Sequence, residues 1–206
     1  MRRLLFTLLL APAFAQNCPQ EDWITLFNGK DLTGWKIGGD ATTFQIQDGA
    51  LVTRGEVAHA YYDGPAHDFK NFELSVDVMA EANSNGGIYF HTEFQDRGFP
   101  RKGFEVQVNN SYNVDPIKTG SLYHVQDVGT LEIKDNQWYT TNILVRGNTV
   151  TVHINGKQVV QWTQTPEWNG GREGPGRVIG LGTIALQGHD AGSTVHYKNI
   201  RIRPLP

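Results

Sequence analysis

Two segments of the sequence place polar side chains on strands whose alternate positions are apolar. In segment 103–108, Phe104, Val106 and Val108 alternate with polar residues, and segment 184–190 ends in a second polar run. The polar residues of the two segments are Glu105, Gln107, Gln187, His189 and Asp190. Successive residues of a strand face opposite sides, so one face can pack while the other carries carboxylate, amide and imidazole groups. These groups suit acid–base catalysis or hydrogen bonding to a polar ligand.

Aromatic and imidazole side chains are expected to join these polar groups from other elements. Tyr89 and His91 are predicted to share the face opposite the apolar side of their strand, and Trp168 flanks the Gly-rich stretch 169–177. Carboxylates and amides bind vicinal hydroxyls, and aromatic faces cover apolar C–H surfaces, so a polyhydroxylated ligand fits. The alternative is that the polar side chains of segment 103–108 only occupy a solvated sheet face. The predicted ligand-binding set is Tyr89, His91, Gln107, Tyr123, Trp168, Gln187 and Asp190, with His189 and Asp190 at the rim.

The strands that carry these residues belong to an all-β pattern. Short runs rich in Val, Ile, Thr and aromatic residues are separated by Gly, Asn, Asp and Pro, which is typical of a sandwich or barrel. Turn residues such as Asn155-Gly156 predict tight hairpins between antiparallel neighbours. The apolar parity of the last strand changes near Lys198 and Asn199, which predicts a bulge. Strands are expected at 44–47, 50–53, 72–79, 87–93, 104–108, 139–146, 149–154, 157–162, 178–187 and 194–203, in two packed antiparallel sheets.

The first residues predict export. Arg2 and Arg3 precede an apolar run, and Ala13-Phe14-Ala15 forms a small-x-small cleavage site, so residues 1–15 are predicted to be a signal peptide. Residues 16–22 would then be a tail and 23–206 a single domain. The apolar run is too short to span a bilayer, which takes about 20 residues, so no membrane insertion is expected after signal removal. Lipidation of Cys18 is the alternative, but the residues before it match a lipobox poorly.

Charge and motifs narrow the function classes. Without Arg2 and Arg3 the chain has 16 basic and 21 acidic residues, and this acidic balance argues against nucleic acid as the main partner. A single cysteine excludes an internal disulfide, so the fold depends on its hydrophobic core. Neither a phosphate-binding loop nor a Gly-x-Ser-x-Gly element occurs, and no His-x-x-x-His spacing points to a metal.

In order and spacing, several segments resemble the 3-keto-disaccharide hydrolase domain family. They include Asn83-Ser84-Asn85-Gly86-Gly87-Ile88-Tyr89-Phe90 and Phe104-Glu105-Val106-Gln107-Val108, together with 26–35, 44–51, 71–74, 119–123, 184–189 and 198–205. The resemblance covers most of the mature chain and implies a concanavalin-like jelly-roll β-sandwich. Many family members have an arginine and an aspartate where this chain has His91 and Asn109.

The resemblance also implies a reaction and a substrate. A 3-keto sugar has an acidic C2–H, so a base can remove that proton, an enediolate can expel the C1 substituent, and water can add to complete net hydrolysis. On this hypothesis Glu105 and His189 act as base or acid, and Gln107 and Gln187 hold sugar oxygens. His91 or Tyr123 would then lie near the developing charge.

Other interpretations remain open at the level of sequence. A noncatalytic carbohydrate-binding domain of the same fold is the main alternative, since a fold does not fix a function. A structural or partner-binding domain of the cell envelope is another. No cofactor is assigned, and a divalent metal such as calcium stays open because concanavalin-like folds often carry one.

Overall fold

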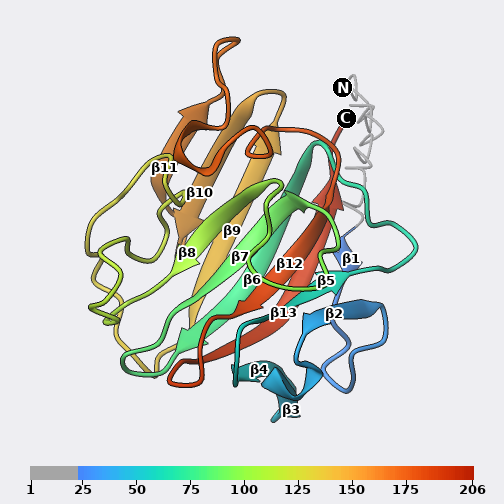
Figure 1. The fold of residues 1–206 in the computed structure, drawn as a ribbon, viewed down its shortest axis with the longest axis vertical. Coiled ribbons are helices and arrows are strands. Elements are labelled where there is room, and N and C mark those ends of the chain that lie inside the picture. Colours follow the sequence, from blue (N-terminus) through green and yellow to red (C-terminus); the bar gives the residue numbers. More distant parts are fainter. Residues whose placement is uncertain (1–22) are drawn as a thin grey trace, which may run out of the picture.

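The computed structural model describes residues 23–206 (Figure 1). The predicted signal peptide and the tail at 16–22 lie outside the described residues. Two short 3₁₀ helices, η1 (Ala41–Thr43) and η2 (Gly171–Glu173), are the helices of this part of the chain, and neither is long enough to cross a membrane. The strands are β1 (Ile24–Thr25), β2 (Trp35–Gly39), β3 (Phe44–Gln47), β4 (Ala50–Arg54), β5 (Ala58–Tyr62), β6 (Phe72–Ala80), β7 (Gly86–Thr92), β8 (Phe104–Val108), β9 (Tyr139–Arg146), β10 (Thr149–Ile154), β11 (Lys157–Thr163), β12 (Thr183–Gly188) and β13 (Thr194–Pro204).

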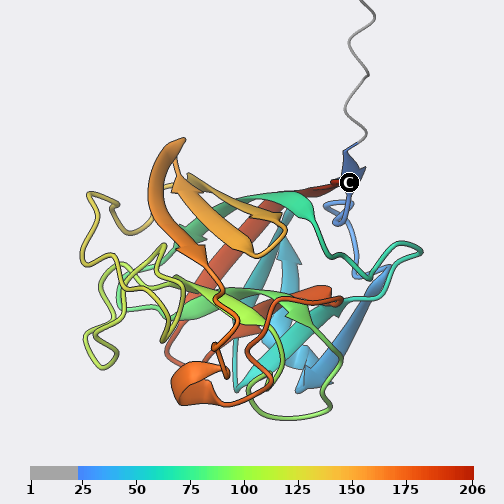
Figure 2. The ribbon, with the colours of Figure 1, turned by 90° about the horizontal axis from the view of Figure 1, so that it is seen from above.

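The strands form two antiparallel sheets that pack face to face. The larger sheet has eight strands in the order β11-β10-β9-β6-β13-β4-β3, with β1 paired to β13. The smaller sheet has five strands in the order β2-β5-β12-β7-β8. Figure 2 shows the sheets as two layers, with η2 on the side of the smaller sheet. The prediction of an all-β sandwich is confirmed.

The core lies between the two sheets and explains the alternation in the sequence. Phe104, Val106 and Val108 of β8 are buried in the same apolar cluster as Leu74 and Val76 of β6. Glu105 and Gln107 therefore stand on the outer face of the smaller sheet, away from the core. The alternation of side chains along β8 therefore puts the polar groups on the face that carries the site.

Most predicted strands are confirmed, with three omissions and one overextension. Strands β1, β2 and β5 were not predicted, and the run predicted at 178–187 becomes a strand only from Thr183. The bulge predicted near Lys198 and Asn199 is confirmed, since the register between β13 and β6 shifts there and Asn199 has a φ of 50°.

Candidate active site

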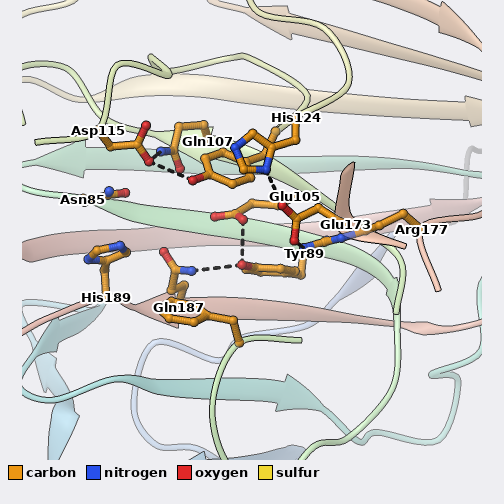
Figure 3. A pocket seen from close by; sticks show the side chains of 12 residues that line it. Asn85, Tyr89, Glu105, Gln107, Asp115, His124, Glu173, Arg177, Gln187 and His189 are labelled. Atoms are coloured by element: carbon orange, nitrogen blue, oxygen red, sulfur yellow. Dashed lines mark hydrogen bonds and ion pairs between the residues drawn. The ribbon is translucent and has the colours of Figure 1, made fainter. Parts of the chain in front are cut away.

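A cavity of about 280 Å³ opens on the outer face of the smaller sheet. Its floor is formed by side chains of β7, β8 and β12, and its walls come from the loops that flank these strands and from the segment around η2 (Figure 3). The residues that line it are Asn85, Tyr89, Phe99, Glu105, Gln107, Asp115, Tyr123, His124, Glu173, Arg177, Gln187 and His189. The structure therefore brings together six of the residues predicted from sequence: Tyr89, Glu105, Gln107, Tyr123, Gln187 and His189.

Glu105 lies on the floor of the cavity and is only 4% exposed. Its carboxylate has room because residue 87 is glycine: a Cβ there would lie 2.2 Å from Oε1 of Glu105. The Tyr89 hydroxyl donates a 2.6 Å hydrogen bond to Oε2. Burial raises the pKa of Glu105 to about 7, although Tyr89 and Arg177 act in the opposite direction. Glu105 is thus able to exchange a proton near neutral pH.

The amide side chains around Glu105 have hydrogen-bonding capacity to spare. Gln187 donates through Nε2 to the Tyr89 oxygen at 3.0 Å, which leaves its Oε1 without a partner. Oε1 of Gln107 and both polar side-chain atoms of Asn85 are also buried without a partner in the protein. Buried polar atoms are normally hydrogen-bonded, so this set indicates a place for a ligand rich in hydroxyl groups.

His189 and Asp190 form a pair at the rim of the cavity. Nδ1 of His189 lies 2.7 Å from Oδ2 of Asp190, so the carboxylate holds the ring with its proton on Nδ1 and leaves Nε2 for a ligand. Burial alone would raise the pKa of Asp190, but hydrogen bonds from His189, Ser193 and the Gly192 N–H together lower it. Asp190 belongs to the predicted ligand-binding set but does not itself line the cavity; it lies behind His189.

One wall of the cavity is built from the segment that follows β8. Asp115 accepts a 3.0 Å hydrogen bond from the Tyr123 hydroxyl and a 3.2 Å bond from Nε2 of Gln107. Burial, followed by the charge of Asp115, raises the pKa of Tyr123. Tyr123 is therefore a neutral phenol whose proton is directed at Asp115.

The opposite wall carries a buried cation. Arg177 is buried, donates to the Gly103 carbonyl oxygen at 3.1 Å and lies 3.8 Å from the Glu173 carboxylate. Glu173 also forms an ion pair with His124, which links the segment around η2 to the segment after Tyr123. Nε of Arg177 is buried without a partner, so this guanidinium retains a donor.

The prediction that His91 faces the ligand is wrong. His91 has a φ of 54°, and the register between β7 and β12 shifts by one residue beside it, so the alternation of β7 breaks there. The imidazole is fully buried, packs on Phe72 and bonds to the Lys70 carbonyl oxygen at 2.9 Å. Burial lowers its pKa to about 4, as expected for a neutral structural histidine.

The prediction that Trp168 belongs to the ligand-binding set is also wrong. Its ring packs against Trp162 at 5.0 Å, and its indole N–H donates to the Arg177 carbonyl oxygen at 2.6 Å. Trp168 does not line the cavity, and its hydrogen bond instead anchors the segment that carries Glu173 and Arg177.

Six lining residues were not predicted: Asn85, Phe99, Asp115, His124, Glu173 and Arg177. Asn85 stands in a segment that already supported the family resemblance, and Glu173 and Arg177 stand in the Gly-rich stretch noted around 169–177. All six lie outside the strands, and Asn85 directly precedes β7. In a loop the alternation of a strand is absent, so the sequence does not predict which way a side chain points.

The described residues contain no group of three or more His, Cys, Asp or Glu side chains arranged to hold a metal ion. The donors in the cavity are instead engaged in pairs, such as His189 with Asp190 and His124 with Glu173.

Comparisons with known proteins identify the family. The sequence pattern of the 3-keto-alpha-glucoside-1,2-lyase-like domain matches residues 22–203. The chain belongs to this family. A 3-keto-disaccharide hydrolase of Bacteroides thetaiotaomicron is 25% identical over 237 aligned positions, which cover 90% of this chain and 79% of that protein. The family resemblance expected from the sequence is confirmed.

Solved structures support the same fold. A candidate glycosyl hydrolase from Parabacteroides distasonis has a TM-score of 0.76 and 25% identity, covering 89% of this chain and 94% of that one. A Bacillus subtilis protein described as having a galectin-like fold has a TM-score of 0.63 and 13% identity, covering 88% of this chain and 94% of that one. The predicted jelly-roll sandwich is confirmed, and the two hydrolase relatives support a hydrolase.

Proposed function

We propose that this protein cleaves a 3-keto-disaccharide or 3-keto-glycoside by proton abstraction, elimination and hydration. The observation that carries the proposal is Glu105: a buried carboxyl with a pKa of about 7 that shares one cavity with the His189–Asp190 pair and with unpartnered amides. A sugar with a ketone at C3 has an acidic C2–H, and this site supplies both a base and hydrogen-bond donors.

In the first step Glu105 takes the proton from C2. Its carboxylate lies on the floor of the cavity, where Tyr89 holds Oε2 and the glycine at residue 87 leaves space beside Oε1. A raised pKa makes the carboxylate a stronger base than an exposed glutamate, while a substantial fraction stays ionised at neutral pH.

The enediolate that results carries negative charge on the oxygen at C3. Asn85 Nδ2 and Arg177 Nε are buried donors without partners, and both side chains line the cavity. Donors held in place before the reaction stabilise a developing oxyanion without the cost of reorientation. The unpartnered carbonyl oxygens of Gln107 and Gln187 accept hydrogen bonds from the remaining sugar hydroxyls.

His189 then gives a proton to the departing glycosidic oxygen as the C1–O bond breaks. Asp190 stabilises the imidazolium form through Nδ1, as a carboxylate does for a catalytic histidine. Water adds to C1 of the unsaturated product and returns a proton to His189, while Glu105, whose proton has exchanged with solvent in the meantime, protonates C2. The leaving alcohol and a 3-keto sugar are the net products of hydrolysis.

The name of the Bacteroides relative agrees with this substrate, and the family description agrees with an elimination. A noncatalytic carbohydrate-binding domain would need the amides and aromatic faces, but it would not need a buried carboxyl that titrates near neutral pH. The cavity therefore favours catalysis.

The test is turnover of a 3-keto-disaccharide beside the same disaccharide without oxidation. The proposal predicts release of the aglycone from the oxidised sugar only, and a loss of about a hundredfold or more in kcat/KM for Glu105→Gln and for His189→Ala. Binding of both sugars without cleavage of either would favour the noncatalytic domain.

Export is also proposed, on the sequence of residues 1–15 alone. Expression of the full chain with fractionation and N-terminal sequencing tests it. A mature protein that begins at Gln16 outside the cytoplasm is the expected result, and an intact Met1 in the cytoplasm would overturn the proposal.

A further inference from the structure

A second hollow, of about 530 Å³, adjoins the cavity at its rim. We name the first cavity the inner chamber and this hollow the outer chamber. The two chambers share Asp115, Tyr123, His124 and His189 in their linings, so they meet along these side chains. The other residues of the outer chamber are Tyr112, Val114, Pro116, Ile117, Asp127 and Arg172.

We propose that the outer chamber binds the leaving group of the substrate, and that this group is a second sugar ring or another ring with an apolar face. Which chamber holds the oxidised ring and which holds the leaving group is assigned from the proposed function. The inner chamber holds the unpartnered amides and Glu105, so it suits the oxidised ring whose C2 and C3 react.

The lining of the outer chamber fits a ring rather than a small alkyl group. Tyr112, Pro116 and Val114 present apolar surface, and Val114 is 83% exposed. Asp127 and Arg172 add one carboxylate and one guanidinium, which can bond to hydroxyls on the edge of a ring. An aromatic face with a polar rim is a common way to bind a sugar ring, since the ring has apolar C–H faces and a polar edge.

The wall of the outer chamber is held in place before any ligand binds. Asn109 is fully buried and donates through Nδ2 to the carbonyl oxygens of Asp115 and Ile117, at 3.0 and 2.8 Å. The Lys118 ammonium donates to the carbonyl oxygens of Tyr112 and Asp115, at 2.8 and 3.1 Å. A wall fixed in this way lowers the ordering cost of binding.

His189 lies where the two chambers meet. Its ring centroid is 5.7 Å from that of Phe99, which lines the inner chamber, and 5.7 Å from that of Tyr112, which lines the outer chamber. A bond between a ring in one chamber and a ring in the other would pass this imidazole. That position agrees with the transfer of a proton from His189 to the bridging oxygen.

The test compares two substrates that differ only in the leaving group: a 3-keto-disaccharide and the methyl glycoside of the same 3-keto sugar. For Tyr112→Ala, the ratio of kcat/KM for the disaccharide to kcat/KM for the methyl glycoside should fall about fivefold, as expected for the loss of one aromatic contact. Tyr112→Phe keeps the ring and should keep the ratio. Leu181→Ala changes an exposed apolar residue that lines neither chamber, and it should also leave the ratio unchanged.

An equal loss for both substrates in Tyr112→Ala would show that Tyr112 acts only through His189 and would overturn the assignment. If the parent protein cleaves neither substrate, the proposed function has failed, and the outer chamber is then tested by calorimetric binding of the two unoxidised sugars. A weaker affinity of Tyr112→Ala for the disaccharide alone would support the outer chamber, while equal affinities of parent and variant for each sugar would overturn it.

Discussion

Replacement of Glu105 by glutamine should change how the stability of the protein depends on pH. In the folded protein the carboxyl has a pKa of about 7, whereas an ordinary glutamate has a value of 4.5. Between these two values the unfolded chain releases a proton that the folded protein keeps. The free energy of unfolding of the parent therefore contains a contribution that is fully present below pH 4.5 and is lost as the pH rises through 7.

The size of this contribution follows from the two pKa values. A tenfold change in an ionisation constant corresponds to about 1.4 kcal/mol, so the difference between 4.5 and about 7 corresponds to about 3 kcal/mol. Glutamine has nearly the same shape and can accept the hydrogen bond from Tyr89, but it does not ionise. As the pH rises from 4.5 to 8, the free energy of unfolding of Glu105→Gln should therefore increase by about 3 kcal/mol relative to that of the parent.

Urea denaturation of both proteins at a series of pH values measures this difference directly. The titrating groups that do not interact with Glu105 cancel because both proteins are compared at the same pH. Glu132→Gln, at an exposed carboxylate that does not line the inner chamber, reports the effect of removing one surface charge. If the stabilities of Glu105→Gln and the parent ran parallel across the whole range, Glu105 would not have the raised pKa on which its role as a base depends.

Four further outcomes are expected. Gly87→Ala should keep the fold but lower kcat/KM about a hundredfold, since the added methyl group displaces the Glu105 carboxylate; circular dichroism and initial rates check both parts. His189→Ala should lower kcat/KM by about a hundredfold or more on a disaccharide but much less on a substrate whose leaving group needs no protonation, such as a nitrophenyl 3-keto-glycoside. Asn85→Ala should raise the unfolding free energy by about 1 kcal/mol, because it removes buried amide atoms without partners, and should weaken sugar binding measured by calorimetry. His91→Ala should lower the unfolding free energy by about 2 kcal/mol and leave kcat/KM within about twofold of the parent, and a large kinetic loss in a folded variant would argue for a catalytic His91.

The sequence predicts those strands in which one face packs and the other is polar. Strand β8 is the clearest case, because Phe104 and Val106 alternate with Glu105 and Gln107 and the predicted bounds match the structure. Strand β5 was missed because two of its three core-facing positions are Ala58 and Ala60, and alanine has a low strand propensity. Strand β2 ends in Gly38-Gly39, which lowers its strand propensity.

The floor of the site was predictable from the sequence and its walls were not. Strand parity places Glu105, Gln107 and Gln187 on one face, and it fails at His91 because a single residue with positive φ reverses the direction of the side chain. The walls depend on loops whose conformation is fixed by hydrogen bonds between residues distant in sequence. The ion pair between His124 and Glu173, 49 residues apart, is an example that no local pattern reveals.

The central claim is that bond cleavage begins with removal of the proton at C2. Reaction of a 3-keto-disaccharide in deuterated water, followed by mass and NMR analysis of the released 3-keto sugar, tests it, with the product alone incubated with enzyme as the control for later exchange. The account predicts one deuterium at C2 of the released sugar at early times. Cleavage that leaves the C2 proton in place would contradict it.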